Sequence, residues 1–265
     1  MTGTTGDGWS AGDAYELYMG RWSRRVATLF LDRLAPGPGL DWIEVGCGTG
    51  ALTREILARF DPRSVFALDA SADFIAHARA ASPDPRARFA AGDAQSPPFE
   101  AGAADLAVSA LAINFVPDRA AALAQMARAL RPGGRLAFYV WDYPGGGVGM
   151  IDAFWRAAAS LDAEAAALDE ARRFPFCTPR GLAADVAAAG LPEPEVAPLE
   201  AEAVFADFED LWRPFTLGAG PAPAYCTGLP PGRRAALETR LRETLGPGPI
   251  RLPLRAWSVE VSIPD

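Results

Sequence analysis

Glu44-Val45-Gly46-Cys47-Gly48-Thr49-Gly50 is the stretch that decides the fold of this chain. An apolar run containing Trp42 and Ile43 precedes it, and a helical pattern of apolar residues follows it from Leu52 to Phe60. A strand, a glycine-rich turn and a helix in this order present backbone N–H groups to a nucleotide-like ligand at the start of the helix. Glycine suits such a turn because a side chain would hold the ligand away from the backbone, and because some positions need a positive φ.

The spacing of these residues fits two kinds of nucleotide site. Gly46, Gly48 and Ala51 satisfy the GxGxxG/A fingerprint of dinucleotide-binding turns. The same stretch also has the form ExGxGxG, with Glu44 two residues before the first glycine and Gly50 as the last. The turn alone does not distinguish the two, so the choice depends on the next hundred residues.

Predicted strands and helices alternate from Leu40 to Trp141. After the first strand, further strands are expected at residues 65–69, 88–91, 106–108 and 135–141. Ser71 is expected to cap one helix, and Pro117-Asp118 to open another, which ends at Arg131–Gly134. The apolar face of that second helix is predicted to hold Leu123, Met126, Ala127 and Leu130. This order predicts an α/β fold with a doubly wound, Rossmann-like sheet whose ligand lies above the carboxyl ends of its strands.

Composition excludes several classes of protein. The chain has 265 residues, half of them apolar and 22% charged, which is enough for one α/β domain with a substantial addition and argues against disorder. No apolar run approaches the ~18 residues of a membrane span, and a net charge of −8 argues against a nucleic-acid partner. The first six residues lack the features of a signal peptide and are expected to form a loose leader. Three cysteines without metal-ligand spacing predict no metal site and a reducing, cytoplasmic compartment.

Carboxylates follow the second and third predicted strands. Asp69 stands about 20 residues after the turn, where it can chelate two ribose hydroxyls, which suits either kind of site. Gly92-Asp93-Ala94 ends the third strand, Asp105 opens the fourth, and Leu130–Gly134 precedes the fifth. Together with the ExGxGxG turn, these elements resemble the class I S-adenosylmethionine-dependent methyltransferases, in particular the small-molecule enzymes of the quinone-biosynthesis type. The likeness covers residues 12–142.

The resemblance implies that S-adenosylmethionine is the cofactor and that its methyl group passes to a small molecule. It implies Asp69 on the ribose, Asp93 on the adenine amino group, and a helix from Tyr15 to Ser23 that closes over the cofactor. Two of these residues have a simpler alternative: Asp93 can cap its own loop as an Asx turn, and Arg21 can be part of a helix face instead of binding the methionine carboxylate. The predicted cofactor-binding residues are Tyr18, Arg21, Glu44, Gly46, Cys47, Gly48, Asp69, Ala70, Gly92, Asp93, Ala94, Ser109 and Leu111.

Candidates for a general base are few. Methyl transfer from a sulfonium is an in-line displacement that depends mainly on alignment, and a base adds ~10² to 10⁴ in rate when the acceptor is a hydroxyl or phenol. His77, the only histidine, is expected on a helix face away from the chemistry. Relatives often carry histidines where Asn114 and Phe115 stand. The candidate catalytic residues are therefore Asp142 and Tyr143, with Tyr18 or a later acid as alternatives, unless the acceptor needs no base.

Two helical insertions, after strands five and six, are expected to form a lid in which the substrate binds. The predicted segments are 1–142 (N-terminal helices and cofactor core), 143–177 (first lid insertion), 178–205 (core helix and sixth strand), 206–250 (second lid insertion) and 251–265 (seventh strand). The aromatic residues of the insertions form either a small helical core or an apolar pocket for a bulky or aromatic metabolite. The predicted substrate contacts are Asn114, Trp155, Trp212 and Tyr225.

Three functions stay open at this point. Methyl transfer to a small molecule is the prediction. The alternatives are a relative that binds S-adenosylmethionine without transferring its methyl group, and a nicotinamide-dependent dehydrogenase that uses the same turn. The methyl acceptor, the accepting atom (O, N, C or S) and the oligomeric state do not follow from the sequence.

Overall fold

The structure is a computed structural model that describes residues 16–265. The predicted leader, and Tyr15 at the start of the predicted N-terminal helix, lie outside these residues. The chain divides into two compact units. Unit 1 takes the described residues as far as Arg25, together with Asp142–Pro175 and Glu200–Arg255, and unit 2 takes Val26–Trp141, Phe176–Leu199 and Ala256–Asp265. The predicted segment 1–142 thus contains residues of both units: those as far as Arg25 belong to unit 1, and Val26–Trp141 belong to unit 2.

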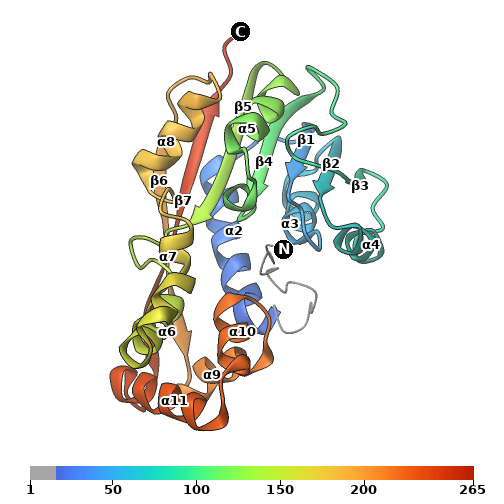
Figure 1. The fold of residues 1–265 in the computed structure, drawn as a ribbon. Coiled ribbons are helices and arrows are strands. Elements are labelled where there is room, and N and C mark those ends of the chain that lie inside the picture. The colour runs from blue at the N-terminus through green and yellow to red at the C-terminus, as the bar shows by residue number, and fades with distance from the viewer. Residues whose placement is uncertain (1–15) are drawn as a thin grey trace, which may run out of the picture. The chain divides into compact units, whose positions relative to one another are not determined.

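A seven-stranded sheet in the order β3-β2-β1-β4-β5-β7-β6 confirms the predicted α/β fold (Figure 1). Strands β1 to β5 are parallel to one another, whereas β7 pairs with β5 in the antiparallel direction. The central strands are almost completely buried. The strands are β1 (Asp41–Val45), β2 (Ser64–Asp69), β3 (Ala87–Ala91), β4 (Ala104–Ala110), β5 (Leu130–Trp141), β6 (Glu195–Phe205) and β7 (Ile250–Ser262).

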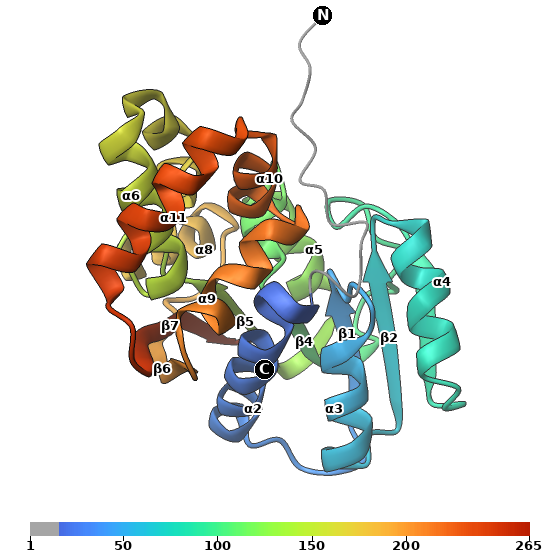
Figure 2. The same ribbon diagram turned by 90° about the horizontal axis from the view of Figure 1, so that it is seen from below.

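Helices cover both faces of the sheet in unit 2, with α2 and α3 on one face and α5 and α8 on the other (Figure 2). Ser71 and Asp118 start their helices as predicted, and each accepts a backbone N–H from the first turn of the helix that follows, as Thr178 also does. Arg119 and Asp185 join α5 to α8 through an ion pair of 2.7 Å. The helices are α2 (Arg21–Leu34, which begins in unit 1), α3 (Ala51–Phe60), α4 (Ala72–Ala81), α5 (Arg119–Arg128) and α8 (Pro179–Ala188).

The end of α5 differs from the prediction. The helix stops at Arg128, and Leu130 is the first residue of β5, where it pairs with Ala104. The pairing then shifts, so that Leu106 lies opposite Arg135 and the residues 131–134 bulge from the strand. Gly133, with φ of +72°, makes this bulge possible. Helical spacing placed Leu130 on the wrong element because a bulged strand begins where the helix was expected to end.

Unit 1 is mainly helical, as predicted for the two insertions. One group of helices follows β5 and another follows β6. Its elements are η1 (Glu16–Gly20), α6 (Gly149–Leu161), η3 (Ala163–Leu168), α7 (Glu170–Arg173), α9 (Phe208–Trp212), η4 (Arg213–Leu217), α10 (Pro221–Gly228) and α11 (Pro231–Leu245). None of the helices from residue 16 onward combines the length and apolar character needed to cross a membrane.

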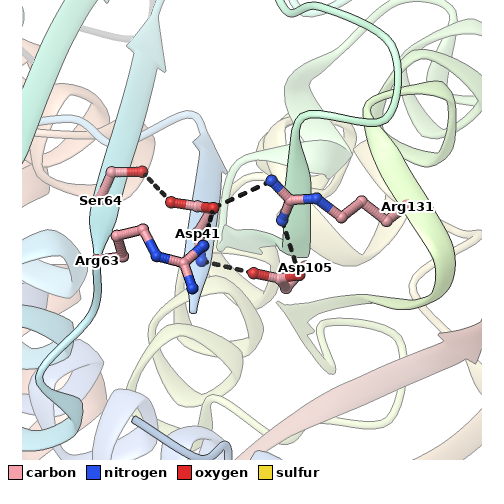
Figure 3. Close-up of polar contacts among 5 residues, drawn as sticks. All are labelled: Asp41, Arg63, Ser64, Asp105 and Arg131. Carbon is pink, nitrogen blue, oxygen red and sulfur yellow. Dashed lines mark hydrogen bonds and ion pairs between the residues drawn. The ribbon is translucent and has the colours of Figure 1, made fainter. Parts of the chain in front are cut away.

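A network of charges braces the amino ends of β1 and β4 in unit 2 (Figure 3). Arg131 bonds to Asp105 at 2.7 Å and to Asp41 at 3.0 Å, and Asp105 also accepts the backbone N–H of Asp41 at 2.8 Å. Ser64, the first residue of β2, and Arg63, directly before it, both donate hydrogen bonds to the Asp41 carboxylate. Burial raises the pKa of Asp41, but the hydrogen bonds from Ser64, Arg131 and Arg63 outweigh it and hold the pKa below its ordinary value. Asp105 thus stabilises the sheet at the edge opposite the glycine turn.

Asp105→Ala is expected to lower the free energy of unfolding by about 1–3 kcal/mol, because it leaves the Asp41 N–H without its side-chain acceptor and Arg131 with Asp41 as its remaining carboxylate partner. Thermal unfolding measures this loss. Arg63→Ala is the control, since it removes only a solvent-exposed ion pair to the same network, which contributes ~0–1 kcal/mol. Equal stability of the two variants would refute the bracing role of Asp105.

Candidate functional site

The glycine turn leaves β1 and starts α3 at the carboxyl edge of the sheet. The N–H groups of Gly46 and Cys47 both donate to the Leu68 carbonyl, at 2.8 and 3.0 Å, so the turn is fixed against β2. Gly46 has φ of +74°, and a Cβ there would lie 2.1 Å from that of Ala112. Gly48 has φ of +53°, and a Cβ there would meet no protein atom within 4 Å. The first glycine is required by the fold, whereas the second faces open space that a ligand can use.

Glu44 lies beneath the turn and is 1% exposed. Its carboxylate accepts a hydrogen bond from the hydroxyl of Thr53 on α3. Burial raises the pKa of Glu44 to about 7, against the opposing effect of the Thr53 bond. Glu44 therefore links β1 to α3 and holds the turn between them; Thr53 had no motif to mark it in the sequence.

Between pH ~4.5 and ~7, the free energy of unfolding is expected to fall as the pH rises. In this range the unfolded chain releases the Glu44 proton while the folded chain retains it. Glu170, whose pKa burial also raises to about 7, acts with the same sign. Denaturant unfolding measured across this range should show that the free energy of unfolding falls less steeply with pH in Glu44→Gln than in the wild type. Thr53→Val removes the bond that lowers the Glu44 pKa, so it should extend the decline to higher pH; an unchanged slope in Glu44→Gln would contradict this account.

Asp69 ends β2 and faces the glycine turn. One carboxylate oxygen accepts the Gly48 N–H at 2.8 Å, and the other accepts the Ser71 N–H at 2.9 Å. Each oxygen of a carboxylate can accept a second hydrogen bond. Asp69 thus shapes the turn and still has capacity for two neighbouring hydroxyls, and Ala70 lies directly after it.

Gly92, Asp93 and Ala94 follow β3 as predicted. A Cβ on Gly92 would lie 2.8 Å from a methyl carbon of Leu68, which explains glycine at this position. Asp93 accepts both the backbone N–H of Gln95 at 2.9 Å and its side-chain amide at 3.1 Å. The Gln95 hydrogen bonds lower the pKa of Asp93, which is therefore an ionised acceptor at neutral pH. Asp93 thus forms the Asx turn that was its alternative role in the sequence analysis, and its side chain stays exposed.

Two buried polar groups, one near the end of β4 and one in the loop after it, have no partner in the part of the chain that the structure describes. The Ser109 hydroxyl and the Asn114 side-chain NH₂ are buried without a hydrogen bond within the described part of the chain. Ser109 lies beside the turn, since its Oγ would be 3.9 Å from a Cβ on Gly46. Leu111 has φ of +57°, uncommon outside glycine, and Asn114 sits on the short helix η2 (Ile113–Phe115). Buried donors without partners are rare in folded proteins, and a bound ligand is one way to satisfy them.

Unit 2 therefore brings together the cofactor residues predicted after β1, β2, β3 and β4, together with Asn114. Tyr18, Arg21 and the remaining predicted site residues belong to unit 1. The Arg21 guanidinium bonds to Asp210 at 3.0 Å and lies 4.2 Å from the ring centre of Trp22. The Tyr18 ring packs against Phe215 with ring centres 5.5 Å apart. Arg21 thus has partners within its own unit, as the helix-face alternative supposed.

Asp142 is held firmly in unit 1. Its carboxylate bonds to Arg255 at 2.6 Å and accepts the Gly145 N–H at 3.0 Å, and it is 2% exposed. Asp142 raises the pKa of Arg255 in return. These contacts fix the glycine-rich segment after β5 and do not support the predicted role of Asp142 as a base. Tyr143 packs its ring on Phe174, with ring centres 5.6 Å apart.

The aromatic residues of the insertions form a core within unit 1. Phe154 stacks on Phe215 at 4.5 Å, and Tyr225 lies 5.4 Å from Trp155. Trp155 is 1% exposed and donates its indole N–H to the buried carboxylate of Glu170. Trp155 is thus a core residue and does not line a pocket, because its side chain is enclosed by the helices of this unit. Helical aromatic spacing in the sequence did not separate these two roles.

Trp212 differs from Trp155 because it also lines a cleft of about 800 Å³ within unit 1. The cleft lies between η1 and the start of α2 on one side and α9 and η4 on the other, and its lining includes Leu17, Arg21 and Asp210. Leu17 is 49% exposed. Trp212 and Arg21 were predicted as site residues, but the cleft was not, because it forms only when segments about 190 residues apart come together.

Covalent catalysis and metal chemistry find little support in the residues that the structure describes. Burial raises the pKa of the Cys47 thiol, which keeps it protonated and weakly nucleophilic. All three cysteines lie in the described part of the chain, where they are buried and form no disulfide. From residue 16 onward no group of acidic, cysteine and histidine side chains is arranged to hold a metal ion. His77 lies on the exposed face of α4.

Comparison with known proteins gives relatives for the part of the chain that holds the glycine turn. Residues 43–138 match the family model of the methyltransferase domain. Over 98 residues, the chain is 40% identical to a trans-aconitate 2-methyltransferase of Deinococcus radiodurans, covering 37% of this chain and 36% of that protein. Over 132 residues it is 32% identical to a demethylmenaquinone methyltransferase of Beutenbergia cavernae, covering 50% and 52%. The chain thus spans about half, or less, of the length of these curated relatives.

The fold has relatives among solved structures. A Haemonchus contortus phosphoethanolamine N-methyltransferase 2 in complex with S-adenosyl-L-methionine aligns with a TM-score of 0.59, over 96% of this chain and 56% of that one, at 18% identity. At this identity the likeness concerns the fold alone.

Proposed function

Because the chain belongs to the class I S-adenosylmethionine-dependent methyltransferases, we propose that it transfers the methyl group of this donor to a small-molecule acceptor. The observation that carries the proposal is the pairing of Asp69 with the Gly48 N–H beside open space at the glycine turn. A ribose with two neighbouring hydroxyls suits the remaining capacity of this carboxylate.

Other residues of unit 2 fit the rest of the donor. Asp93, ionised and exposed after β3, is an acceptor for the adenine amino group. The buried Ser109 hydroxyl beside Gly46 lacks a partner within the described chain and suits a polar group of the donor. When bound, S-adenosylmethionine supplies an electrophilic methyl group on a sulfonium. The residues of the chain bind it, orient it and exclude water.

We propose that the acceptor is a bulky or aromatic metabolite recognised by unit 1. The two curated relatives are named for trans-aconitate and demethylmenaquinone. The cleft with Trp212 and exposed Leu17, beside Arg21 and Asp210, offers apolar surface together with charges of both signs. Such a surface suits an amphipathic small molecule.

Catalysis is proposed to proceed by alignment of the acceptor with the methyl group, without a histidine base. His77→Ala is accordingly expected to leave kcat within a few-fold of the wild type and to change stability by no more than about 0.5 kcal/mol, because the side chain is exposed. Steady-state rates measured across pH 5–9 test this. A rate limb near pH ~6.5 that disappears in the variant would assign the histidine a catalytic role.

Calorimetric titration with S-adenosylhomocysteine and with NADH distinguishes the two nucleotide classes. S-adenosylhomocysteine is expected to bind with a Kd in the micromolar range or tighter, and NADH at least 100-fold more weakly. Tight binding of NADH would replace the proposal with the dehydrogenase alternative.

A further inference from the structure

The strongest unexplained feature of unit 2 is the side chain of Asn114. It is 5% exposed, yet its NH₂ group has no hydrogen-bond partner within residues 16–265. It follows β4 on η2, five residues after Ser109, whose hydroxyl is also buried and unpartnered beside the glycine turn. Leaving an amide donor buried and unsatisfied is unfavourable, because the group has lost its hydrogen bonds to water and gained none in return. A ligand with a hydrogen-bond acceptor atom would remove this cost.

The loops at the same edge of unit 2 hold few groups that can take a proton from an acceptor. Residues 110–117 contain no titratable side chain. Among the titratable residues at the ends of β1 to β3, Glu44 is buried beneath the turn against Thr53, and Cys47 keeps its proton. Asp69 is bonded by two backbone N–H groups, and the pKa of Asp93 is lowered. An acceptor that arrives already deprotonated needs no base from these loops.

Carboxylic acids combine these two properties. Amines and phenols carry their proton near neutral pH, with ordinary pKa values of about 10, whereas carboxylic acids, at about 4, have lost it. A carboxylate also has two oxygens, so one can attack while the other accepts a hydrogen bond from the Asn114 NH₂.

We infer that the acceptor is a carboxylate, held through one oxygen by Asn114 and methylated on the other to a methyl ester. This inference rests on the proposed methyl transfer. The attacking oxygen forms a bond to the methyl carbon while the carbon–sulfur bond breaks and its electron pair goes to sulfur. The products are the methyl ester and S-adenosylhomocysteine, and no proton is released. Asn114 is thereby a specificity-determining residue of unit 2.

Substitutions of Asn114 test its part in binding the acceptor. Asn114→Leu keeps the size and removes the donor, so kcat/KM for the acceptor should fall about 10- to 100-fold, as expected for loss of a hydrogen bond to a charged group. Asn114→Asp adds a like charge and should lower it further, by more than 100-fold. The Kd of S-adenosylhomocysteine should change less than 3-fold in both variants, and the melting temperature of Asn114→Leu should be at least that of the wild type.

Ser82→Ala is the matched control, because it removes another buried and unpartnered polar group of unit 2 at the far end of α4. It should leave kcat/KM unchanged. A large fall in the melting temperature of Asn114→Leu would mean that Asn114 is a structural residue, and a rise in kcat/KM for Asn114→Asp would mean that the acceptor is a cation; either result overturns the inference.

The decisive experiment identifies the bond that is formed. The full chain is incubated with S-adenosylmethionine labelled in its methyl group, a protein-free bacterial metabolite extract, and the probes octanoate, benzoate, octylamine, octanethiol and phenol. We expect transferred label that mild alkali releases as volatile methanol, as for a methyl ester. Transferred label that resists alkali would overturn the carboxylate inference while leaving methyl transfer in place. No transferred label, with S-adenosylhomocysteine still bound, would overturn the proposed function itself.

Discussion

Gly46→Ala is expected to weaken binding of S-adenosylhomocysteine at least 100-fold and to destabilise the protein by more than about 3 kcal/mol. The new Cβ would lie 2.1 Å from the Cβ of Ala112, so the loop after β4 or the glycine turn has to move. The positive φ of +74° adds about 1 kcal/mol of backbone strain. Calorimetry gives the binding constant and thermal unfolding gives the stability.

Gly48→Ala distinguishes an effect on ligand binding from an effect on the stability of the fold. Its Cβ meets no protein atom within 4 Å, so the cost to stability should be only the ~1 kcal/mol of a left-handed alanine. Gly102→Ala is the matched control, with φ of +64° and equally open surroundings, in the loop before β4. The two variants should lose the same stability, but only Gly48→Ala should weaken binding. Equal affinity in both would show that the ligand does not approach Gly48.

Asp69→Ala is expected to weaken cofactor binding by a factor of about 10² or more. Two charge-assisted hydrogen bonds to the ribose, at about 1.5–3 kcal/mol each, account for this loss. The variant also frees the N–H groups of Gly48 and Ser71 that hold the turn. Calorimetric titration with S-adenosylhomocysteine measures the effect.

Asp73→Ala controls for the change in net charge, because Asp73 is an exposed acid in the first turn of α4. It should bind S-adenosylhomocysteine as the wild type does. An unchanged Kd in Asp69→Ala would remove the ribose assignment, and with it the main support for a nucleotide-like ligand at this turn.

Much of the fold was predictable because short-range patterns determine it. The apolar run before Gly46, the cap at Ser71 and the cap at Thr178 are local signals, and the structure has each of them. Leu130 was assigned to the wrong element because the bulge that takes it into β5 depends on pairing with Ala104, 26 residues away. Periodicity within a helix contains no information about such pairing.

The candidate site was predictable only in part. Motif spacing identified Asp69 and the glycines, since their roles depend on position relative to the strand ends. It did not identify Thr53 beneath Glu44, nor the burial of the Asn114 donor, since both are consequences of tertiary packing. The same holds for Trp155, whose bond to Glu170 places it in the interior of unit 1. Motif spacing therefore indicates which residues lie at the sheet edge, whereas their hydrogen-bond partners depend on tertiary packing.

Formation of S-adenosylhomocysteine tests the central claim most directly. The chain is incubated with S-adenosylmethionine, with and without a protein-free bacterial metabolite extract, and S-adenosylhomocysteine is quantified over time. The account predicts many equivalents per protein molecule, formed only when the extract is present, and a rate reduced at least 100-fold in Asp69→Ala at subsaturating donor. Tight binding of S-adenosylmethionine without any S-adenosylhomocysteine formed above the extract-free background would contradict it, and would indicate a relative that binds the molecule but does not transfer its methyl group.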